Sequence, residues 1–476
     1  MTPSPDLPTP AQTPQQRDRV AAIQLAEEPS AGGAPLHSKQ DSSASPISHP
    51  PFSQAVRLWF KLGLISFGGP AGQIATMHKL LVDDNRWFSE RQFMQGLNYC
   101  MLLPGPEAQQ LATYLGWRLH GAKGGIAAGA LFVLPSMLVL WGLSWLFMAG
   151  GNLPWLAAIF QALAAAALAV VAQAILRIGR KSLKSAALLL IAVLSFVLIH
   201  FGNVSFLWII LGAALLGYAG NLWLPRQFPA GGGHGPGHGA KQAQTLVLPP
   251  APPASWQRTF LILAVGLTLW WGPVFALAGI FGWSSLPAQQ GLFFSQAALV
   301  TFGGAYAVLP YVAQQAVDNY GWLTPDQMLA GLALAETTPG PLIMVLQFVG
   351  FVGGWRQPGE LSPLAMGTIC GLITTWVTFL PSFIMIFLGA PHLEQLDQKP
   401  RLNAALTAIT AAVVGVILNL AVKFGQGTLL PEGEFAWGEA LLTVGAFLAL
   451  QSGRVGLIAV ILGCGALGWA GWLIWG

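Results

Sequence analysis

The fold is decided by a stretch that opens with Ser66-Phe67-Gly68-Gly69-Pro70 and closes with Pro104-Gly105-Pro106. The chain contains this stretch twice, because Thr301-Phe302-Gly303-Gly304 and Pro339-Gly340-Pro341 follow at the same spacing, 235 positions later. The register between the copies holds without a gap over about fifty residues, which indicates an internal repeat. Glycines and prolines interrupt apolar sequence at matching positions in both copies. In membrane transporters, such paired interruptions point to a substrate site built from broken helices.

The composition of the chain is that of a membrane protein. Only 8% of its 476 residues are charged and 54% are hydrophobic, whereas about a quarter of the residues of a soluble domain are charged. The formal net charge of +4 lies mostly in short loops, where it sets orientation in the membrane and does not indicate nucleic-acid binding. We therefore expect an all-α polytopic membrane protein, in which two inverted-topology helical repeats contain broken or re-entrant helices.

The distribution of apolar residues divides the chain into four parts. Residues 1–50 are rich in Pro, Ser, Gln and Ala and contain no signal-peptide core, so we expect a disordered N-terminal tail. Residues 51–223 form the first membrane repeat and residues 258–476 form the second. The polar residues 224–257 between them, which are rich in Gly and Pro, are expected to be a flexible cytoplasmic linker.

Helical spans need about 20 apolar residues, and each half of the chain supplies several such ranges. They are 55–78, 94–118, 125–149, 155–176, 185–200 and 204–223, followed by 258–281, 290–315, 328–353, 363–389, 402–423, 436–450 and 454–475. The four basic residues between positions 177 and 184 place their loop in the cytoplasm. The extra span at 258–281 then turns the second copy over, which predicts inverted repeats. The ranges 55–78 and 94–118 can instead be re-entrant. If both are re-entrant, the two copies still have opposite orientations in the membrane.

The breaks inside the apolar segments provide the chemistry. Gly68-Gly69-Pro70 frees backbone N–H groups within the bilayer, and such a break is tolerated only against protein or a wet cavity. The half-helix that follows presents unpaired N–H groups and the positive end of its dipole. Together these features suit an oxyanion. The second copy offers the same arrangement, although Ala305 replaces the proline after its glycine pair.

We therefore assign substrate binding to the breaks and to the hydroxyl and amide groups beside them. These residues are Ser66, Phe67, Gly68, Gly69, Gln73, Asn98, Pro104, Gly105, Pro106, Thr301, Phe302, Gly303, Gly304, Thr337, Thr338, Pro339, Gly340 and Pro341. The alternative is that glycine and proline only let the helices kink or pack closely, since both are common in transmembrane helices. Four breaks in matched pairs favour a binding site.

Two carboxylates are expected at membrane depth, where such groups are costly and usually functional. They are Glu107 and Glu336, which are not matched under the repeat because Leu342 aligns with Glu107. We assign both to proton coupling of transport, and the alternative is a carboxylate that caps a helix or faces a solvated vestibule. Lys61 and Arg118 are our choices for attracting the anion, although snorkelling to the interface explains most such residues.

These motifs invite a family assignment. Together with Leu134-Pro-Ser136 and Leu380-Pro-Ser382, the repeated stretches resemble the chromate ion transporter family in its long, two-domain form, from residue 52 to 476. The resemblance implies an inner-membrane exporter of chromate that confers resistance, with sulfate as the structural analogue. It implies the lipid bilayer and a chromate or sulfate dianion as partners, with no cofactor and no nucleic acid. A homodimer is left open.

Other functions compete with chromate export for the same sequence features. An importer of sulfate or another oxyanion is an alternative on the same scaffold, because both dianions are tetrahedral and of similar size. An enzyme is disfavoured because His78, His120 and His200 are scattered, so neither catalytic nor metal-binding residues are expected. His234 and His238 in the linker are more simply solvated than metal-bound. A channel is a further alternative, and the absence of a Walker A sequence argues against an ATP-driven pump.

Overall fold

The computed structural model describes residues 49–150, 153–228, 255–302, 304–392 and 400–475, which belong to the unit Ile47–Gly476. The described residues form helices and no strand. The first half contains α2 (Phe52–Ile65), α3 (Gly69–His78), η1 (Lys79–Asp84), α4 (Glu90–Leu102), α5 (Glu107–Ala149), α6 (Pro154–Ser182), α7 (Ala186–His200) and α8 (Phe206–Trp223). The second half contains α9 (Trp256–Phe281), α10 (Leu286–Leu299), α11 (Ala305–Ala313), η2 (Gln314–Asn319), α12 (Pro325–Thr337), η3 (Leu342–Met344), α13 (Val345–Arg356), α14 (Pro363–Gly389), η4 (Ala390–His392), α16 (Pro400–Leu429), η5 (Pro431–Gly433), α17 (Trp437–Gln451) and α18 (Leu457–Trp475).

Seven of the described helices are long and apolar enough to cross a membrane. They are α5, α6, α8, α9, α14, α16 and α18. The prediction of an all-α polytopic membrane protein is therefore confirmed. Nearly all of the predicted tail, most of the predicted linker with His234 and His238, and Gly303 lie outside the described residues. The division into four parts stays a prediction.

Four of the predicted spans are not continuous helices. The range 55–78 is divided into α2 and α3, and the range 290–315 into α10 and α11. The ranges 94–118 and 328–353 are likewise interrupted, after α4 and after α12. The interruptions coincide with glycines whose φ angles are positive, a region that other residues avoid, and with prolines that lack an N–H group.

The two copies fold alike along their matched residues. η1 and η2 begin and end at matched residues, and so do α4 and α12. Both α4 and α12 begin with a capping box, formed by Ser89 with Gln92 and by Thr324 with Gln327. The repeat therefore specifies local structure as well as sequence. That the copies have opposite orientations in the membrane stays a prediction.

α5 is two helices that fold back on each other. His120 and Gly121 have non-helical backbone angles, and Gly121 has a φ of 62°. A Cβ atom on Gly125 would lie 3.1 Å from the carbonyl oxygen of Thr113, so the two arms approach closely across the turn. In the second copy, α13 and α14 pack against each other in the same order along the chain. Each copy thus continues from its second break into a helical hairpin.

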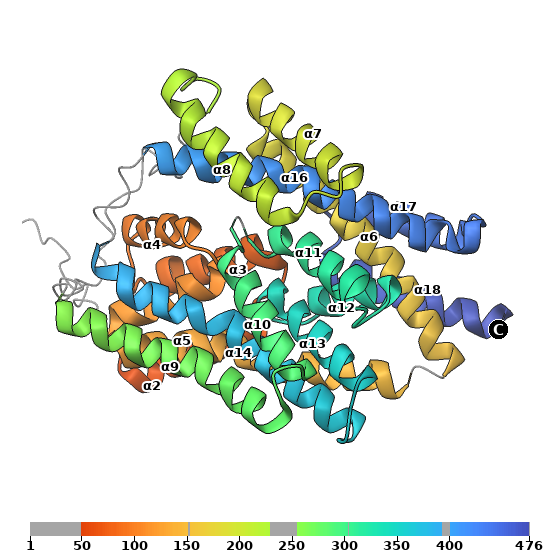
Figure 1. Cartoon of the computed structure of the whole chain (residues 1–476), viewed down its shortest axis with the longest axis horizontal. Helices are drawn as coiled ribbons and strands as arrows, with labels where there is room; N and C mark the ends of the chain where they lie inside the picture. The colour runs from red at the N-terminus through yellow and green to blue at the C-terminus, as the bar shows by residue number, and fades with distance from the viewer. Residues whose placement is uncertain (1–48, 151–152, 229–254, 303, 393–399, 476) are drawn as a thin grey trace, which may run out of the picture. The chain divides into compact units, whose positions relative to one another are not determined.

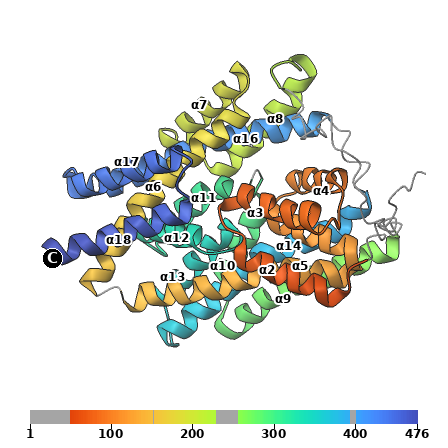
Figure 2. The same cartoon turned by 180° about the vertical axis from the view of Figure 1, so that it is seen from behind.

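The remaining helices surround this repeated part. α16 packs against α7 and α8, and α6 packs against α12, α16, α17 and α18. Figures 1 and 2 show α3 and α11 near each other, with α4 on one side and α12 and α13 on the other. The first helices after the two glycine pairs are therefore neighbours, although more than 200 residues separate them in sequence.

Candidate functional site

The four helix breaks meet in two pairs. The N–H of Gly105 donates to the carbonyl oxygen of Thr301 at 2.7 Å, and the N–H of Gly340 donates to the carbonyl oxygen of Ser66 at 2.7 Å. Gly105 and Gly340 are matched residues of the repeat, and so are Ser66 and Thr301. Each copy therefore donates one backbone hydrogen bond to the other copy and accepts the equivalent bond from it. Reciprocal contacts of this kind indicate a two-fold relation between the copies.

Both Pro-Gly-Pro turns require glycine. Gly105 has a φ of 122° and Gly340 a φ of 97°, in the region that favours glycine. A Cβ atom on Gly105 would lie 2.7 Å from Oγ of Ser382, and one on Gly340 would lie 2.7 Å from Cβ of Ser136. These serines end the two Leu-Pro-Ser motifs, so each turn packs against the motif of the other copy.

Several buried polar atoms near these junctions have no hydrogen-bond partner within the described residues. They are Oγ of Ser66, Oε1 of Gln73, Oε1 of Gln109, Oε1 of Gln110 and Oγ of Ser136, and all five side chains are at most 1% exposed. A buried polar group without a partner costs free energy, so a group of them is typical of a site that receives a polar ligand. The NH2 groups of the three glutamines already donate to protein oxygens, so their free oxygens can only accept, and the two serine hydroxyls are the groups of this set that can donate to an anion.

The start of α3 faces open space. Gly68 and Gly69 have φ angles of 87° and 68°, and no heavy atom beyond the neighbouring chain lies within 4 Å of a Cβ atom built on Gly69. Gln73, one turn later, donates its amide N–H to the carbonyl oxygen of Gly340 and so connects α3 to the opposite turn. The first N–H groups of α3 are thus held beside a junction.

Glu107 begins α5, and its carboxylate also lies near the start of α11. It is the first residue of α5, and its Oε1 lies 3.9 Å from the position of a Cβ atom on Gly304. Gly304 directly precedes α11. The carboxylate of the first copy therefore reaches the glycine break of the second copy, where the positive end of the α11 dipole stabilises a negative charge.

Glu336 is buried, at 3% exposure, and accepts a hydrogen bond from the hydroxyl of Tyr306. Tyr306 is the second residue of α11 and matches Ala71 in the first copy. Sequence reasoning missed this tyrosine. The sequence feature that could have identified it is a tyrosine two residues after the second glycine pair, where the first copy has an alanine.

The hydroxyls of the second copy are already engaged. The side chains of Thr301, Thr337 and Thr338 donate to backbone carbonyl oxygens of the helices that precede them, at 2.7 to 2.9 Å. Only Ser66 of the four predicted hydroxyl residues has an unpartnered side chain among the described residues. Asn98 is half-buried in α4. Free donors therefore gather at the first break and not equally at both.

The basic residues expected to attract the anion lie at the surface of the first copy. Lys61 lies on an exposed face of α2, and Arg118 is half-buried two residues before the turn of α5. Two further cations, Arg177 and Lys181, lie on α6, which packs against α12, the helix that carries Glu336. Both belong to the last turns of α6 and were interpreted only as signals of orientation. Attraction of the anion by Lys61 and Arg118 stays a prediction.

The histidines have separate partners. His78 contacts Glu90 at 2.5 Å and His200 contacts Asn419 at 2.8 Å. Within the described ranges, no group of three His, Cys, Asp or Glu side chains is placed to hold a metal ion.

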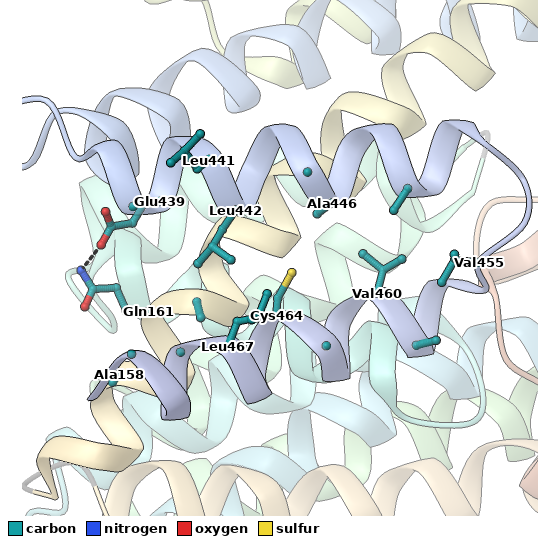
Figure 3. A pocket seen from close by; sticks show the side chains of 18 residues that line it. Ala158, Gln161, Glu439, Leu441, Leu442, Ala446, Val455, Val460, Cys464 and Leu467 are labelled. Atoms are coloured by element: carbon teal, nitrogen blue, oxygen red, sulfur yellow. Dashed lines mark hydrogen bonds between the residues drawn. The ribbon is translucent and has the colours of Figure 1, made fainter. Parts of the chain in front are cut away.

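A cavity of about 640 Å³ lies elsewhere, between α6, α17 and α18 (Figure 3). Its lining is small and apolar, with Cys464 and Val460 on α18 facing Leu442 on α17. Its one charged lining residue is Glu439, which accepts a hydrogen bond from Gln161 at 2.7 Å. A dianion would meet a carboxylate and no cation there, so this cavity does not suit an oxyanion.

Comparison with known proteins identifies the family. The sequence model of the family described as "Chromate transporter" matches residues 53–218 and 288–469. The chain is 34% identical to a "Chromate transport protein" of Pseudomonas aeruginosa over 430 residues, which cover 89% of this chain and 92% of the relative. It is 28% identical to a "Probable chromate transport protein" of Synechococcus elongatus, over 82% of this chain and 89% of the relative. A "Chromate transport protein" of Cupriavidus metallidurans is 28% identical, over 79% of this chain and 83% of the relative. No solved structure matches at a significant level. The chain belongs to the chromate transporter family.

Proposed function

We propose that this protein is a secondary transporter that exports chromate across the inner membrane and so confers chromate resistance. The observation that carries the proposal is the meeting of the four helix breaks, with buried, unpartnered hydroxyls beside the start of α3. A tetrahedral dianion accepts hydrogen bonds on several sides, from backbone N–H and from hydroxyl groups. The names of the relatives supply chromate as the substrate. Sulfate, with the same shape and charge, is expected to compete.

The membrane potential favours export. An inside-negative potential stabilises outward movement by about 2.3 kcal/mol per charge per 100 mV, which is about 4.6 kcal/mol for a dianion. This corresponds to a gradient of roughly a thousandfold, since each 1.4 kcal/mol is a factor of ten. Arg177 and Lys181, in the region assigned to the cytoplasm, would attract the anion to that side of the site. One chain suffices for the site, because both copies of the repeat contribute to it.

Import of sulfate or another oxyanion is the second candidate function. The observation that favours it is the pair of carboxylates at the junctions, Glu107 and Glu336. Moving a dianion inward works against the potential and therefore needs a coupled cation, which a carboxylate can carry as a proton.

Transport into inverted membrane vesicles distinguishes the two functions. For an exporter, we expect chromate to accumulate in the vesicle lumen, faster when the lumen is made positive, with sulfate competing. An ionophore that collapses the potential should reduce the accumulation. Accumulation of the anion in right-side-out vesicles, driven only by a proton gradient, would instead establish import.

Neutralising the two cations at the end of α6 is expected to weaken substrate capture. Arg177→Gln and Lys181→Gln should each raise KM for chromate about two- to fivefold at low ionic strength, with kcat nearly unchanged, because the field of these charges concentrates the anion near the site. The effect should fade as salt is added. Arg454→Gln, an exposed arginine between α17 and α18, is the matched control. A KM that is equal for all three variants would contradict this role.

A further inference from the structure

The two matched half-helices do not start in the same surroundings. Gly69, the first residue of α3, and Gly304, the residue directly before α11, are equivalent residues of the repeat. At Gly69, a Cβ atom would have no neighbour within 4 Å, whereas at Gly304 its neighbour within that distance is Oε1 of Glu107, at 3.9 Å. One helix start faces open space and the other faces a carboxylate.

The repeat explains this difference by a single residue. Glu107 and Leu342 each follow a Pro-Gly-Pro turn directly and are matched in register. The reciprocal hydrogen bonds of the two turns bring the turn before Leu342 to the first glycine break, as they bring the turn before Glu107 to the second, but no atom of Leu342 comes within 4 Å of a Cβ atom built on Gly69. Leucine carries no charge, so the N–H groups at the start of α3 receive no anion from the protein.

The hydroxyl groups at the two junctions follow the same division. Ser66, three residues before Gly69, is fully buried and its Oγ has no partner, whereas Oγ1 of the matched Thr301 donates to a carbonyl oxygen at 2.7 Å. Oγ of Ser136 is also unpartnered. The residues three positions before Gly69 and Gly304 therefore differ, because the hydroxyl of Ser66 is free and that of Thr301 is engaged.

We infer that Glu107 is a tethered anion that occupies the start of α11, the counterpart of the substrate site at the start of α3. Its carboxylate takes the place that a second oxyanion would otherwise take, so the chain binds one substrate dianion and not two. This inference rests on the proposed function, because it takes the start of α3 as the position of the substrate.

The test counts bound anions on the purified full chain in detergent, by equilibrium dialysis with radiolabelled sulfate and, separately, chromate. We expect one anion per chain for the unaltered protein. Glu107→Leu, which copies the residue found in the other repeat, should bind two. Glu107→Gln, which removes the charge but keeps the shape, should also bind two. Glu439→Gln, which alters a carboxylate in the distant apolar cavity, is the matched control and should bind one.

The converse variant is Leu342→Glu, which places a carboxylate at the start of α3 and should bind none. Its thermal unfolding is followed as well, so that lost binding is counted only for folded protein. If both Glu107 variants bind one anion with unchanged affinity, the inference is overturned. If the unaltered chain binds neither sulfate nor chromate, the proposed function fails instead. The two failures are therefore distinguishable.

Discussion

Gly105→Ala and Gly340→Ala should each reduce chromate transport at least about tenfold. An alanine at a positive φ costs about 1–2 kcal/mol, and each 1.4 kcal/mol corresponds to a factor of ten. At Gly105 the added Cβ would also lie 2.7 Å from Oγ of Ser382 and 2.8 Å from Nε2 of Gln110. The turn must then shift, and the hydrogen bond from Gly105 to Thr301 that joins the two copies is lost with it.

The matched control for these variants is Gly142→Ala. Gly142 lies in the second arm of α5, and no atom comes within 4 Å of a Cβ built there. Alanine at such a helical position should leave transport unchanged and stabilise the helix by up to about 1 kcal/mol. Uptake into inverted vesicles at equal protein content gives the measurement. Full activity of both turn variants would show that the junctions do not need their present backbone.

Changing the buried pair of Tyr306 and Glu336 should separate stability from coupling. Tyr306→Phe removes the hydroxyl that donates to Glu336 and leaves a buried carboxylate without this partner. A hydrogen bond to a charged group contributes about 1.5–3 kcal/mol, so the free energy of unfolding should fall by that amount. Glu336→Gln keeps an acceptor oxygen for Tyr306 but cannot release a proton. It should therefore fold normally and lose most of its transport and its pH dependence.

Two measurements distinguish the effects of Tyr306→Phe and Glu336→Gln. Thermal unfolding in detergent reports the stability, and vesicle uptake across a series of pH values reports the coupling. Tyr311→Phe, which alters another buried phenol of α11, controls for loss of a hydroxyl as such. If transport by Glu336→Gln keeps both its rate and its pH profile, a coupling role for this carboxylate is excluded.

The sequence predicted the repeated architecture because the determining residues lie close together along the chain. Helix breaks follow from glycine and proline, whose backbone preferences are local, and the structure interrupts the helices at those residues. The capping boxes at Ser89 and Thr324 are equally local. Hydropathy likewise marked the parts of the chain that form the seven long apolar helices, but it predicted thirteen spans, several of which are broken or short. The gapless register then indicated which interruptions correspond to each other.

Contacts between the copies could not be predicted in the same way. Ser136 and Ser382 were noticed only as parts of a family motif, and their spacing departs from the register of the repeat. The longer connection of the second hairpin, from Gln357 to Ser362, accounts for part of this departure, since the first hairpin turns at Gly121. Their packing against the opposite Pro-Gly-Pro turns depends on tertiary structure that periodicity does not contain.

The cations near the carboxylates were missed for a related reason. In sequence, Arg177 and Lys181 are part of a basic cluster, and such clusters usually report only orientation in the membrane. α6 packs against α12, the helix that carries Glu336, and this tertiary contact cannot be read from the basic cluster in the sequence. Lys61 was chosen because it precedes the first glycine pair by six residues, but proximity in sequence does not decide which face of α2 carries it.

The close glycine contacts within the two hairpins have a mechanical consequence. A Cβ on Gly129 would overlap Thr113 across the first hairpin, and one on Gly350 would overlap Thr374 across the second. Arms in such contact cannot slide past each other without losing dense packing, so each hairpin should move as one rigid lever. The hairpins pack against each other, and the turn before each one is joined to the opposite copy by a backbone hydrogen bond, at Gly105 and at Gly340. Alternating access would then be a rocking motion about two pivots, with the anion held beside one of them.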